Sequence, residues 1–180
     1  KAIIQGMILS GDNVFLDKNK NLTLDTNILG ISPNGWEIKA SELKFNKEAK
    51  ELVSTKPMYA KNEEKGVEIL ANKFKTTISM DNITLEDGVV IKNKLFSILA
   101  DKANYNNSSK IITLEGNIRL SNGIGEVGDI NTLKDVKDIP NNSINKNDKE
   151  MSGTFSKVYF DLNERNLYAT DGFDLKYDEV

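Results

Sequence analysis

The stretch "LADKANYNNSSKIITLEGNIRL", residues Leu99–Leu120, decides the fold. Apolar and polar residues alternate towards both of its ends, which predicts two β-strands, and the polar segment "NNSS" from Asn106 suits the turn between them. The apolar residues of the second strand share one side of it: Ile112, Leu114, Ile118 and Leu120. The stretch therefore predicts an antiparallel hairpin with one apolar face.

The same pattern occurs in five windows that align without a gap. They begin at Ser10, Ala40, Ala71, Ala100 and Phe155. Two columns hold an apolar residue in every window: Leu22, Leu52, Ile83, Ile112 and Leu167 in one, and Ile28, Met58, Val89, Ile118 and Phe173 in the other. A single hairpin with an apolar face is not stable alone in water, so the windows predict one continuous core.

The apolar face changes its parity inside the repeated unit. Trp36, Ile38 and Ala40 alternate, and the apolar positions then move to Leu43 and Phe45. Such slips predict a β-bulge or a bend of the strand at three places: near Ser41, Asn72 and Asp101. We therefore expect an all-β fold, an antiparallel β-jelly-roll or rolled twisted sheet of about five repeated hairpins, in a single domain over residues 1–180.

Residues 121–153 interrupt the repeat with Gly, Asn, Lys and Asp, and we expect a long loop there. A short strand is expected near 124–130 and disorder near 141–149. Three glycines in this segment spell the dinucleotide motif G-x-G-x-x-G: Gly123, Gly125 and Gly128. That motif needs a preceding buried parallel strand and a following helix, neither of which is predicted here, so we interpret it as part of the loop.

Composition argues against several classes of function. The net charge is only −3 and charges of both signs are interspersed, which disfavours nucleic-acid binding. Cysteine and histidine are absent, so thiol chemistry and the commonest general base and metal ligand are missing. We expect a protein that is not an enzyme and uses no cofactor or metal. No apolar run is long enough to cross a bilayer, and the chain begins with Lys1, so we expect a processed or trimmed product that lacks its natural N-terminus and any anchor on it.

Carboxylates are the remaining acid–base groups. Glu86 with Asp87, and Asp171 with Asp174, are the pairs from which a glycosidase-like site could be built. Nothing in the sequence distinguishes them from residues of turns or outward faces. Two oxygen-rich sets lack the spacing of a calcium loop and are interpreted as turns: Asp161, Asn163 and Glu164, and Asn145, Asn147 and Asp148.

Large aromatic side chains are expected in the core first. The set on the predicted inward parity is Phe15, Phe45, Phe74, Tyr105 and Phe160. Trp36, the lone tryptophan, also begins its unit on the inward parity, and two interpretations remain for it: a buried anchor of the sheet, or a platform for a ligand.

Three phrases carry a resemblance to a known family: "GWEIKASELKFN" from Gly35, "LFSILADKANYN" from Leu95 and "KIITLEGNIRLSNG" from Lys110. They resemble the lipopolysaccharide-transport periplasmic proteins, the OstA-like group that includes LptA and LptC. The resemblance covers the chain apart from 121–153, and the Trp36 phrase is more similar to LptC. The segment "TKPMYAKNEEKG" departs from the pattern because it places a proline and charges where a strand continues in other units.

The resemblance implies a jelly-roll open at both ends whose apolar interior shields lipid acyl chains. Residues expected to line that interior are Trp36, Ile38, Phe45, Phe74, Ile98, Tyr105, Ile112 and Ile118. The implied location is the periplasm, with an inner-membrane tether N-terminal to this chain. The implied partners are lipopolysaccharide or a related lipid, neighbouring Lpt-type jelly-roll proteins and an inner-membrane ABC transporter.

Open ends expose strand edges, which can pair with a strand of another chain. The expected edges are the first segment, Ile3–Leu9, and the last, 166–176. The residues chosen to represent them are Ile3, Ile8, Leu167, Phe173 and Leu175. A neighbouring module, or a second copy in a homo-oligomer, is expected to dock there.

Two other functions stay open. A structural β-repeat, such as a surface or adhesin-like array, would have the same hairpins and a closed, dry interior. A carbohydrate-active enzyme would need a cleft with two paired carboxylates. The residues upstream of Lys1 would separate an LptC-like tethered protein from an LptA-like bridge.

Overall fold

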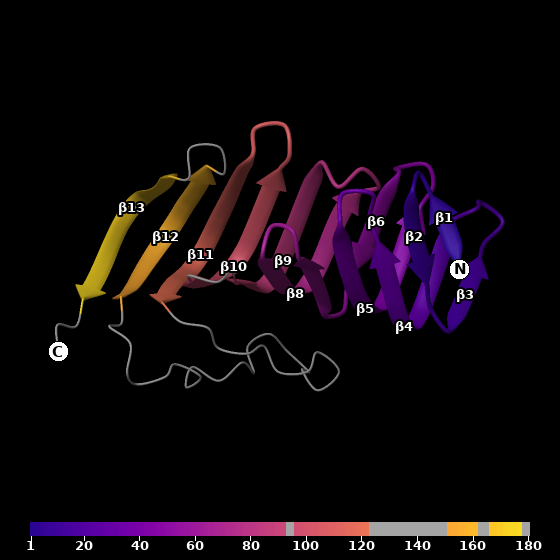
Figure 1. Ribbon diagram of the computed structural model, residues 1–180, viewed down its shortest axis with the longest axis horizontal. Coiled ribbons are helices and arrows are strands. Elements are labelled where there is room, and N and C mark those ends of the chain that lie inside the picture. Colours follow the sequence, from indigo (N-terminus) through magenta and orange to yellow (C-terminus); the bar gives the residue numbers. More distant parts are fainter. Residues whose placement is uncertain (93–95, 123–150, 162–165, 178–180) are drawn as a thin grey trace.

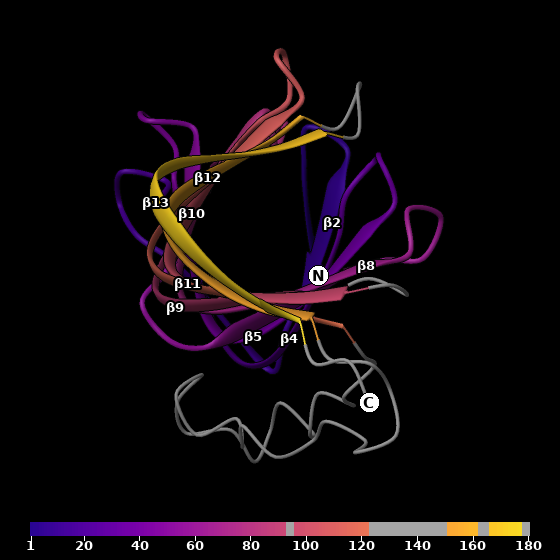
Figure 2. The same ribbon diagram turned by 90° about the vertical axis from the view of Figure 1, so that its left-hand side faces the viewer.

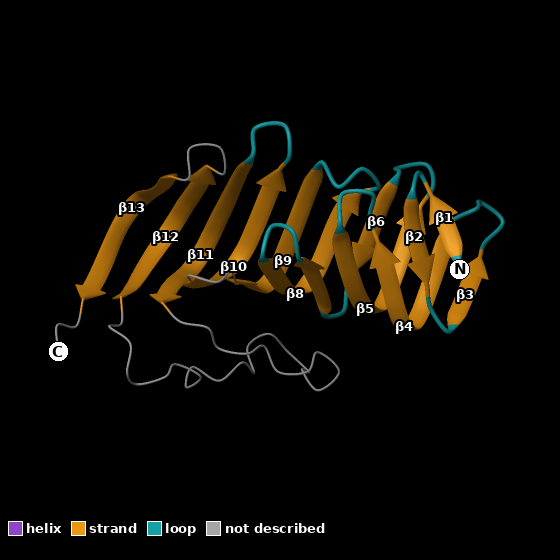
Figure 3. Cartoon of the chain, viewed as in Figure 1, coloured by secondary structure: helices purple, strands orange, loops and turns teal. Residues whose placement is uncertain are grey.

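In this computed structural model the chain is built from β-strands. The structure describes residues 1–92, 96–122, 151–161 and 166–177. The strands are β1 (Ala2–Ile4), β2 (Met7–Ser10), β3 (Asn13–Leu16), β4 (Leu22–Ile31), β5 (Trp36–Asn46), β6 (Glu51–Ser54), β7 (Met58–Asn62), β8 (Val67–Thr77), β9 (Asn82–Lys92), β10 (Phe96–Asn106), β11 (Ile111–Asn122), β12 (Met151–Asp161) and β13 (Asn166–Tyr177). No helix occurs within these residues (Figure 3), so none is long and apolar enough to cross a membrane.

All strands belong to one antiparallel sheet. Their order is β1-β2-β4-β5-β6-β8-β9-β10-β11-β12-β13, with β3 beside β4 and β7 between β5 and β8. The sheet is elongated, and β1–β3 lie at the opposite end from β13 (Figure 1). Each predicted window contains one hairpin, of which β10 and β11 form the fourth. The predicted all-β fold of repeated antiparallel hairpins is therefore confirmed.

Asparagines stabilise two of the predicted turns in the same way. The Asn46 side-chain Oδ1 accepts a hydrogen bond from the backbone N–H of Ala49 at 2.9 Å. Asn106 Oδ1 accepts from the backbone N–H groups of Ser108 and Ser109, each at 3.0 Å. These side chains replace backbone partners that a tight turn lacks, which explains the "NKEAK" and "NNSS" segments between strands. The "LNERN" turn predicted at Leu162 lies largely outside the described residues.

The strand register is irregular at each of the three places where the sequence predicts a slip. The register shifts at Ser41 between β4 and β5, at Asn72 between β8 and β9, and at Asp101 between β9 and β10, which confirms the three predicted bends. The longer segment lies on the second strand of the hairpin: Asp87–Gly88 of β9 stand opposite Asn72 alone in β8, and opposite Asp101 alone in β10 of the next hairpin. These pairs of residues have positive φ angles: Thr26 (63°) and Asn27 (50°), Asp87 (65°) and Gly88 (99°), Gly116 (72°) and Asn117 (45°).

The bends curve the sheet around an interior, as β13 shows in Figure 2. They divide each hairpin into two parts. We call the part between the bend and the hairpin turn the turn arm (102–115 in the fourth unit), and the remainder the base arm. Both arms place apolar residues on the concave face, which we call the inner face.

The second unit lacks the pair of residues with positive φ because it contains Pro57. The proline ring fixes φ near −65°, so the left-handed conformation is inaccessible. The strand is accordingly divided into β6 and β7, with Thr55, Lys56 and Pro57 between them. Ser54 closes the gap: its hydroxyl donates to the Lys56 carbonyl oxygen at 2.9 Å.

The hydrophobic core lies along the inner face from β2 to β12. Its buried side chains form one cluster, which includes Met7, Leu24, Leu85, Leu114 and Val158. β11 continues to Asn122 and β12 begins at Met151, so 121–122 and 151–153 are strand rather than loop, contrary to expectation. The remainder of the predicted loop, with its short strand, its glycine motif and its disorder, lies outside the described residues.

One aromatic residue was assigned to the wrong face. Phe15 was expected in the core but is 60% exposed and pairs with Thr23 on the outer face. The cause is turn length: five residues connect Leu16 to its partner Leu22, whereas six connect Phe45 to Leu52. The gapless alignment therefore displaced β3 by one residue, which exchanges its two faces.

Candidate functional site: the inner face and the sheet edges

An apolar row crosses the turn arms of ten strands. In an antiparallel sheet, residues directly opposite one another share a face, so a chain of paired residues traces a row. This row, the turn-arm row, is Leu16, Leu22, Phe45, Leu52, Thr76, Ile83, Tyr105, Ile112, Phe160 and Leu167. Its polar member, Thr76, is buried and donates its hydroxyl to the Asn82 carbonyl oxygen at 2.9 Å.

A second apolar row crosses the base arms of eleven strands. The base-arm row is Ala2, Leu9, Gly30, Ile38, Ala60, Ile69, Ile91, Ile98, Leu120, Gly153 and Leu175. Small residues alternate with large ones at its N-terminal end. Leu9 and Ile38 are both fully buried there, on either side of Gly30. The two rows run the length of the sheet on either side of the bends.

The predicted lining residues lie on this inner face. Ile38, Phe74, Ile98 and Ile118 are buried in the core cluster. Phe45, Tyr105 and Ile112 are partly buried and pack against it. The structure therefore brings these seven residues together on one surface, which extends along the sheet rather than forming a compact pocket.

The centre of the turn-arm row is less buried than the row members next to it on its N-terminal side. Tyr105 and Ile112, paired across β10 and β11, are half-buried although their row neighbour Ile83 is buried. The Tyr105 hydroxyl donates to Asn107 Oδ1 at 2.9 Å. Burial, together with the nearby Asp81 carboxylate, raises the pKa of Tyr105 above its usual value of 10.0, so this hydroxyl stays neutral and a donor.

Trp36 lies at the start of β5, beside the turns rather than at the centre of the inner face. It is 6% exposed and belongs to the core cluster. Its backbone N–H donates to Ser32 Oγ at 3.0 Å, and Lys65 Nζ lies 5.9 Å from the centre of its ring. Its surroundings resemble those of a buried anchor more than those of an open ligand platform.

The inner face reaches the solvent at the N-terminal end of the sheet. Val14 and Leu16 of β3 pair with the inner-face residues Leu24 and Leu22, yet they are 43% and 67% exposed. At the other end Ala169 of β13 pairs with buried Val158 and is itself exposed. The inner face is thus exposed at both ends of the described sheet. Sequence reasoning missed Val14 and Leu16 because of the short turn after β3.

The free edges of the sheet lie close to the expected places. Ile3 is in β1, which pairs only with β2 among the described strands. Ile8 is not at an edge: β2 pairs with β1 on one side and with β4 on the other, because Gln5 and Gly6 turn the chain between β1 and β2. The N-terminal edge consists of β1 and β3 instead. Leu167, Phe173 and Leu175 belong to β13, whose described pairing is with β12 alone.

The carboxylates Glu86 and Asp87 take part in two separate ion pairs on the outer face. Glu86 lies 3.1 Å from Lys102 Nζ, and Asp87 lies 3.5 Å from Lys73 Nζ, so both carboxylates are neutralised separately. No group of three or more metal-ligating side chains occurs within the described residues. The other carboxylate pair, Asp171 with Asp174, and most of the oxygen-rich sets lie where no side chain is described.

Two hollows are lined mostly by residues outside the two rows, although Ile83 and Tyr105 of the turn-arm row also line one of them. One, of about 630 Å³, is next to the bends of β4 and β5 and is lined by residues such as Asn27, Lys39 and Lys56. The other, of about 410 Å³, lies over β9–β12 near their turns. Sequence reasoning anticipated neither, because each is formed by residues that pairing across strands brings together.

A comparison with solved structures identifies the fold. No family model and no curated protein matches the sequence. The structure is similar to LptH of Pseudomonas aeruginosa, described as the LptA-homologous periplasmic component of the lipopolysaccharide transport device. The TM-score is 0.52 at 12% sequence identity, over 61% of this chain and 82% of that one. The chain therefore has the antiparallel β-jelly-roll fold of the LptA-like transport proteins.

Proposed function

We propose that the inner face binds the acyl chains of a lipid and that the chain is a relay module in lipopolysaccharide export. The observation that carries this proposal is the apolar inner face, whose two rows run along the sheet and which is exposed at both ends of the described sheet. Burial of hydrocarbon contributes about 0.8 kcal/mol per CH₂, so a chain of ~12 carbons supplies on the order of 10 kcal/mol before ordering costs. Such a carrier needs no catalytic residue and no cofactor.

The fold supports the same proposal, because LptH is a component of a lipopolysaccharide transport device and is built in the same way. By this analogy the chain acts in the periplasm, receives lipid from an inner-membrane ABC transporter and passes it to a neighbouring jelly-roll module. An LptC-like chain would be tethered to the inner membrane, and an LptA-like chain would form a bridge.

The two free edges are the proposed docking surfaces. β13 offers one, and β1 with β3 offers the other. Main-chain hydrogen bonds across such an edge would continue the sheet into the next module and would join the apolar rows of the two. The exposed Leu16 lies at this junction, where a partner strand would cover it.

Site-specific photo-crosslinking in cells that make lipopolysaccharide tests the lining. A photo-reactive residue at Ile112 or Ile98 faces the interior, whereas one at Glu115 of the same β11 strand lies on the outer face beside Lys157. We expect lipopolysaccharide to be captured at the two inner positions and not at Glu115. Equal labelling at Ile112 and Glu115 would reject the proposal.

Crosslinkers along β13 test the docking, and a matched pair tests the N-terminal edge. A crosslinker at Ile3 in β1 should capture a neighbouring module or a second copy, whereas one at Ile8 in the interior of the sheet should not. No capture at β13 or at Ile3 would reject docking by edge pairing.

A second candidate is a structural β-repeat with a closed interior. It is favoured by the N-terminal half of the core, where Ile38, Leu43 and Leu52 are fully buried and the side chains form one packed cluster. A dry interior of this kind leaves no room for an acyl chain. The crosslinking experiment separates the two candidates, since a structural repeat captures no lipid at Ile98 or Ile112.

A further inference from the structure

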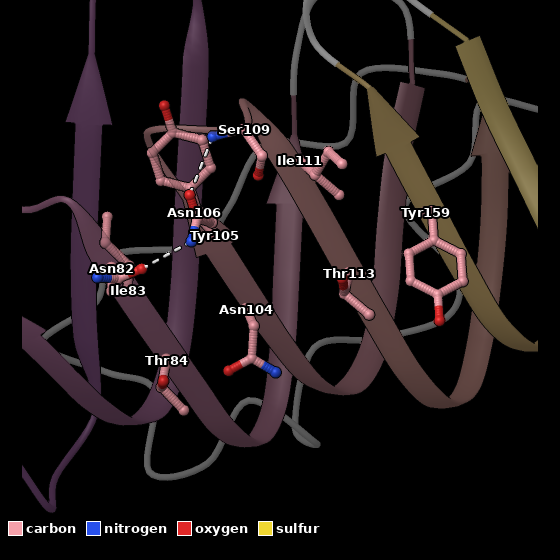
Figure 4. A pocket seen from close by; sticks show the side chains of 10 residues that line it. All are labelled: Asn82, Ile83, Thr84, Asn104, Tyr105, Asn106, Ser109, Ile111, Thr113 and Tyr159. Atoms are coloured by element: carbon pink, nitrogen blue, oxygen red, sulfur yellow. Dashed lines mark hydrogen bonds between the residues drawn. The ribbon is translucent and has the colours of Figure 1, made fainter.

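The outer hollow over β9–β12 is lined by uncharged residues, most of them polar, together with Ile83 and Ile111. It measures about 410 Å³, within the usual range of about 300–1,000 Å³ for small-molecule sites. Its polar lining includes Asn82, Thr84, Asn104, Thr113 and Tyr159, drawn in Figure 4. Among the described residues, no lysine, arginine, aspartate or glutamate lines it. This uncharged lining of polar and apolar residues favours a neutral ligand that has both polar and apolar groups.

Four of these residues form a row across adjacent strands. Thr84 pairs with Asn104, Asn104 with Thr113, and Thr113 with Tyr159. Figure 4 shows their side chains in line, one from each of the strands β9, β10, β11 and β12. Neighbouring strands lie about 4.8 Å apart, so the row offers one hydrogen-bonding group per strand at a spacing similar to the length of one sugar ring.

Three of the four members of this row have unused hydrogen-bonding groups, whereas Tyr159 is hydrogen-bonded to Lys157. Within the described part of the chain, the side chains of Thr84, Asn104 and Thr113 make no hydrogen bond. Two other lining residues, Asn82 and Asn106, are hydrogen-bonded to each other: Asn106 Nδ2 donates to Asn82 Oδ1 at 3.1 Å. This bond holds the two side chains in place at the side of the hollow. The amide and hydroxyl groups of the row can each both donate and accept. A sugar hydroxyl can likewise donate and accept a hydrogen bond. A charged ligand group would do only one of the two, because a carboxylate only accepts and an ammonium group only donates.

The neighbouring charged row is already neutralised. Glu86 pairs with Lys102 at 3.1 Å, and Glu115 pairs with Lys157 at 3.0 Å. Lys157 Nζ also lies 5.4 Å from the centre of the Tyr159 ring and holds the aromatic side chain beside the hollow. The Tyr159 ring adds an apolar surface for the C–H groups of a ligand that is otherwise polar.

We propose that this hollow binds a neutral saccharide through Thr84, Asn104 and Thr113, with Tyr159 as the aromatic wall. The proposal rests on the outer face and is independent of lipid binding on the inner face. The saccharide has two chemical sources, a free oligosaccharide or the sugar part of a glycolipid. Both present the same hydroxyl groups to the row.

Amide chemical shifts of the full chain, measured by ¹⁵N NMR, test the proposal with two probes. Maltotriose represents a free neutral oligosaccharide, and monomeric dodecyl maltoside represents a sugar attached to an alkyl chain. We expect maltotriose to shift the amides of Thr84, Asn104 and Thr113. Dodecyl maltoside should shift the same amides, and if the sugar comes from a glycolipid it should bind more tightly than maltotriose.

Variants identify the groups involved. Asn104→Asp keeps the shape but loses the donor, and Tyr159→Ala removes the wall; each should weaken saccharide binding by about tenfold, the loss expected for one hydrogen bond or stacking contact. Tyr159→Phe should bind normally. Thr23→Ala, on the same outer face of β4 but outside the hollow, is the matched control. Denaturant unfolding confirms that each variant is folded.

Three results would overturn the saccharide site. The first is that neither probe shifts the amides of the row, and the second is that Asn104→Asp and Tyr159→Ala bind as the unmodified chain does. The third is that dodecyl maltoside shifts only inner-face amides such as those of Ala103 and Ile112. That last result would support lipid binding while rejecting the hollow, so the two proposals fail separately.

Discussion

Gly116 lies directly against Asp101 at the bend of the fourth hairpin. A Cβ atom at residue 116 would collide with the Asp101 carboxylate, and the Gly116 φ angle is +72°. Asp101 in turn accepts a hydrogen bond from Asn117 Nδ2 at 2.7 Å. The bend thus depends on the missing side chain at residue 116 and on the short carboxylate of Asp101, which accepts the hydrogen bond.

We predict that Gly116→Ala destabilises the chain by about 2–4 kcal/mol, because it combines a left-handed L-residue with the displacement of Asp101. Gly66→Ala is the matched control: its φ is +62°, but nothing lies within 4 Å of its Cβ position, so about 1 kcal/mol is expected. Urea unfolding measures both. Equal losses of stability in the two variants would show that the collision with Asp101 adds nothing to the cost of the substitution.

The bends illustrate how far the sequence predicts this fold. The parity slips at Ser41, Asn72 and Asp101 located them, because an alternating strand cannot slip without a change of register. The paired strand supplies the residues that allow them, such as Asp87–Gly88, since Asp, Asn and Gly tolerate positive φ. The sequence alone did not show which strand of the hairpin carries the longer segment. That assignment requires the residue pairing between the two strands.

The exposed end of the turn-arm row provides a second prediction. Leu16→Asp should change the free energy of unfolding by less than about 0.5 kcal/mol, because Leu16 is 67% exposed. Leu52→Asp, in the same row but fully buried, should cost more than about 3 kcal/mol, since it places a carboxylate in the core. Thermal or urea unfolding of the two variants distinguishes them. A large loss for Leu16→Asp would mean that this end of the sheet is covered.

The same residue shows why part of the candidate site escaped prediction. The inner face of β8–β11 was predicted correctly because four windows share one turn length. The turn after β3 is one residue shorter, so Phe15 was placed inside and Leu16 was not recognised as an inner-face residue. The outer hollow could not be predicted at all, since Thr84, Asn104 and Thr113 become neighbours only through strand register.

The turn after β3 gives a prediction about pH. The Asn21 backbone N–H donates to Asp17 Oδ1 at 2.9 Å, the Asn21 side-chain amide donates to Oδ2 at 2.9 Å, and the Asn19 N–H donates to Oδ1 at 2.8 Å. These bonds hold the pKa of Asp17 below its usual value of 3.8. A lowered folded-state pKa stabilises the fold above about pH 4 and loses that effect as pH falls through the folded-state pKa.

Asp17→Asn should therefore lower stability at neutral pH and match the unmodified chain in strong acid. Glu48→Gln, in the exposed turn after β5, controls for the loss of one negative charge. The free energy of unfolding, measured by urea titration from neutral to acid pH, checks the difference. A constant difference between Asp17→Asn and the unmodified chain across this range would contradict the assignment.

Asn62 joins two turns at the end of the sheet next to Trp36. Its side chain is fully buried; Nδ2 donates to the Asn34 carbonyl oxygen at 3.1 Å, and Oδ1 accepts from the Lys65 backbone N–H at 2.9 Å. Asn62→Ala leaves both backbone groups without this partner and should cost about 2–4 kcal/mol. Asn46→Ala, which removes one bond in an exposed turn, should cost less than about 1 kcal/mol.

Trp36 reports on the same region, because it is the lone tryptophan and Lys65 lies over its ring. With Asn62→Ala the turn that carries Lys65 is released, so the quenching of Trp36 fluorescence by acrylamide should increase under folding conditions. In Asn46→Ala the quenching should not change, since that turn is at the far end of β5. If quenching is equally low in both variants, the turn that Asn62 holds does not shield Trp36 from solvent. Burial of the ring would then depend on the core residues alone.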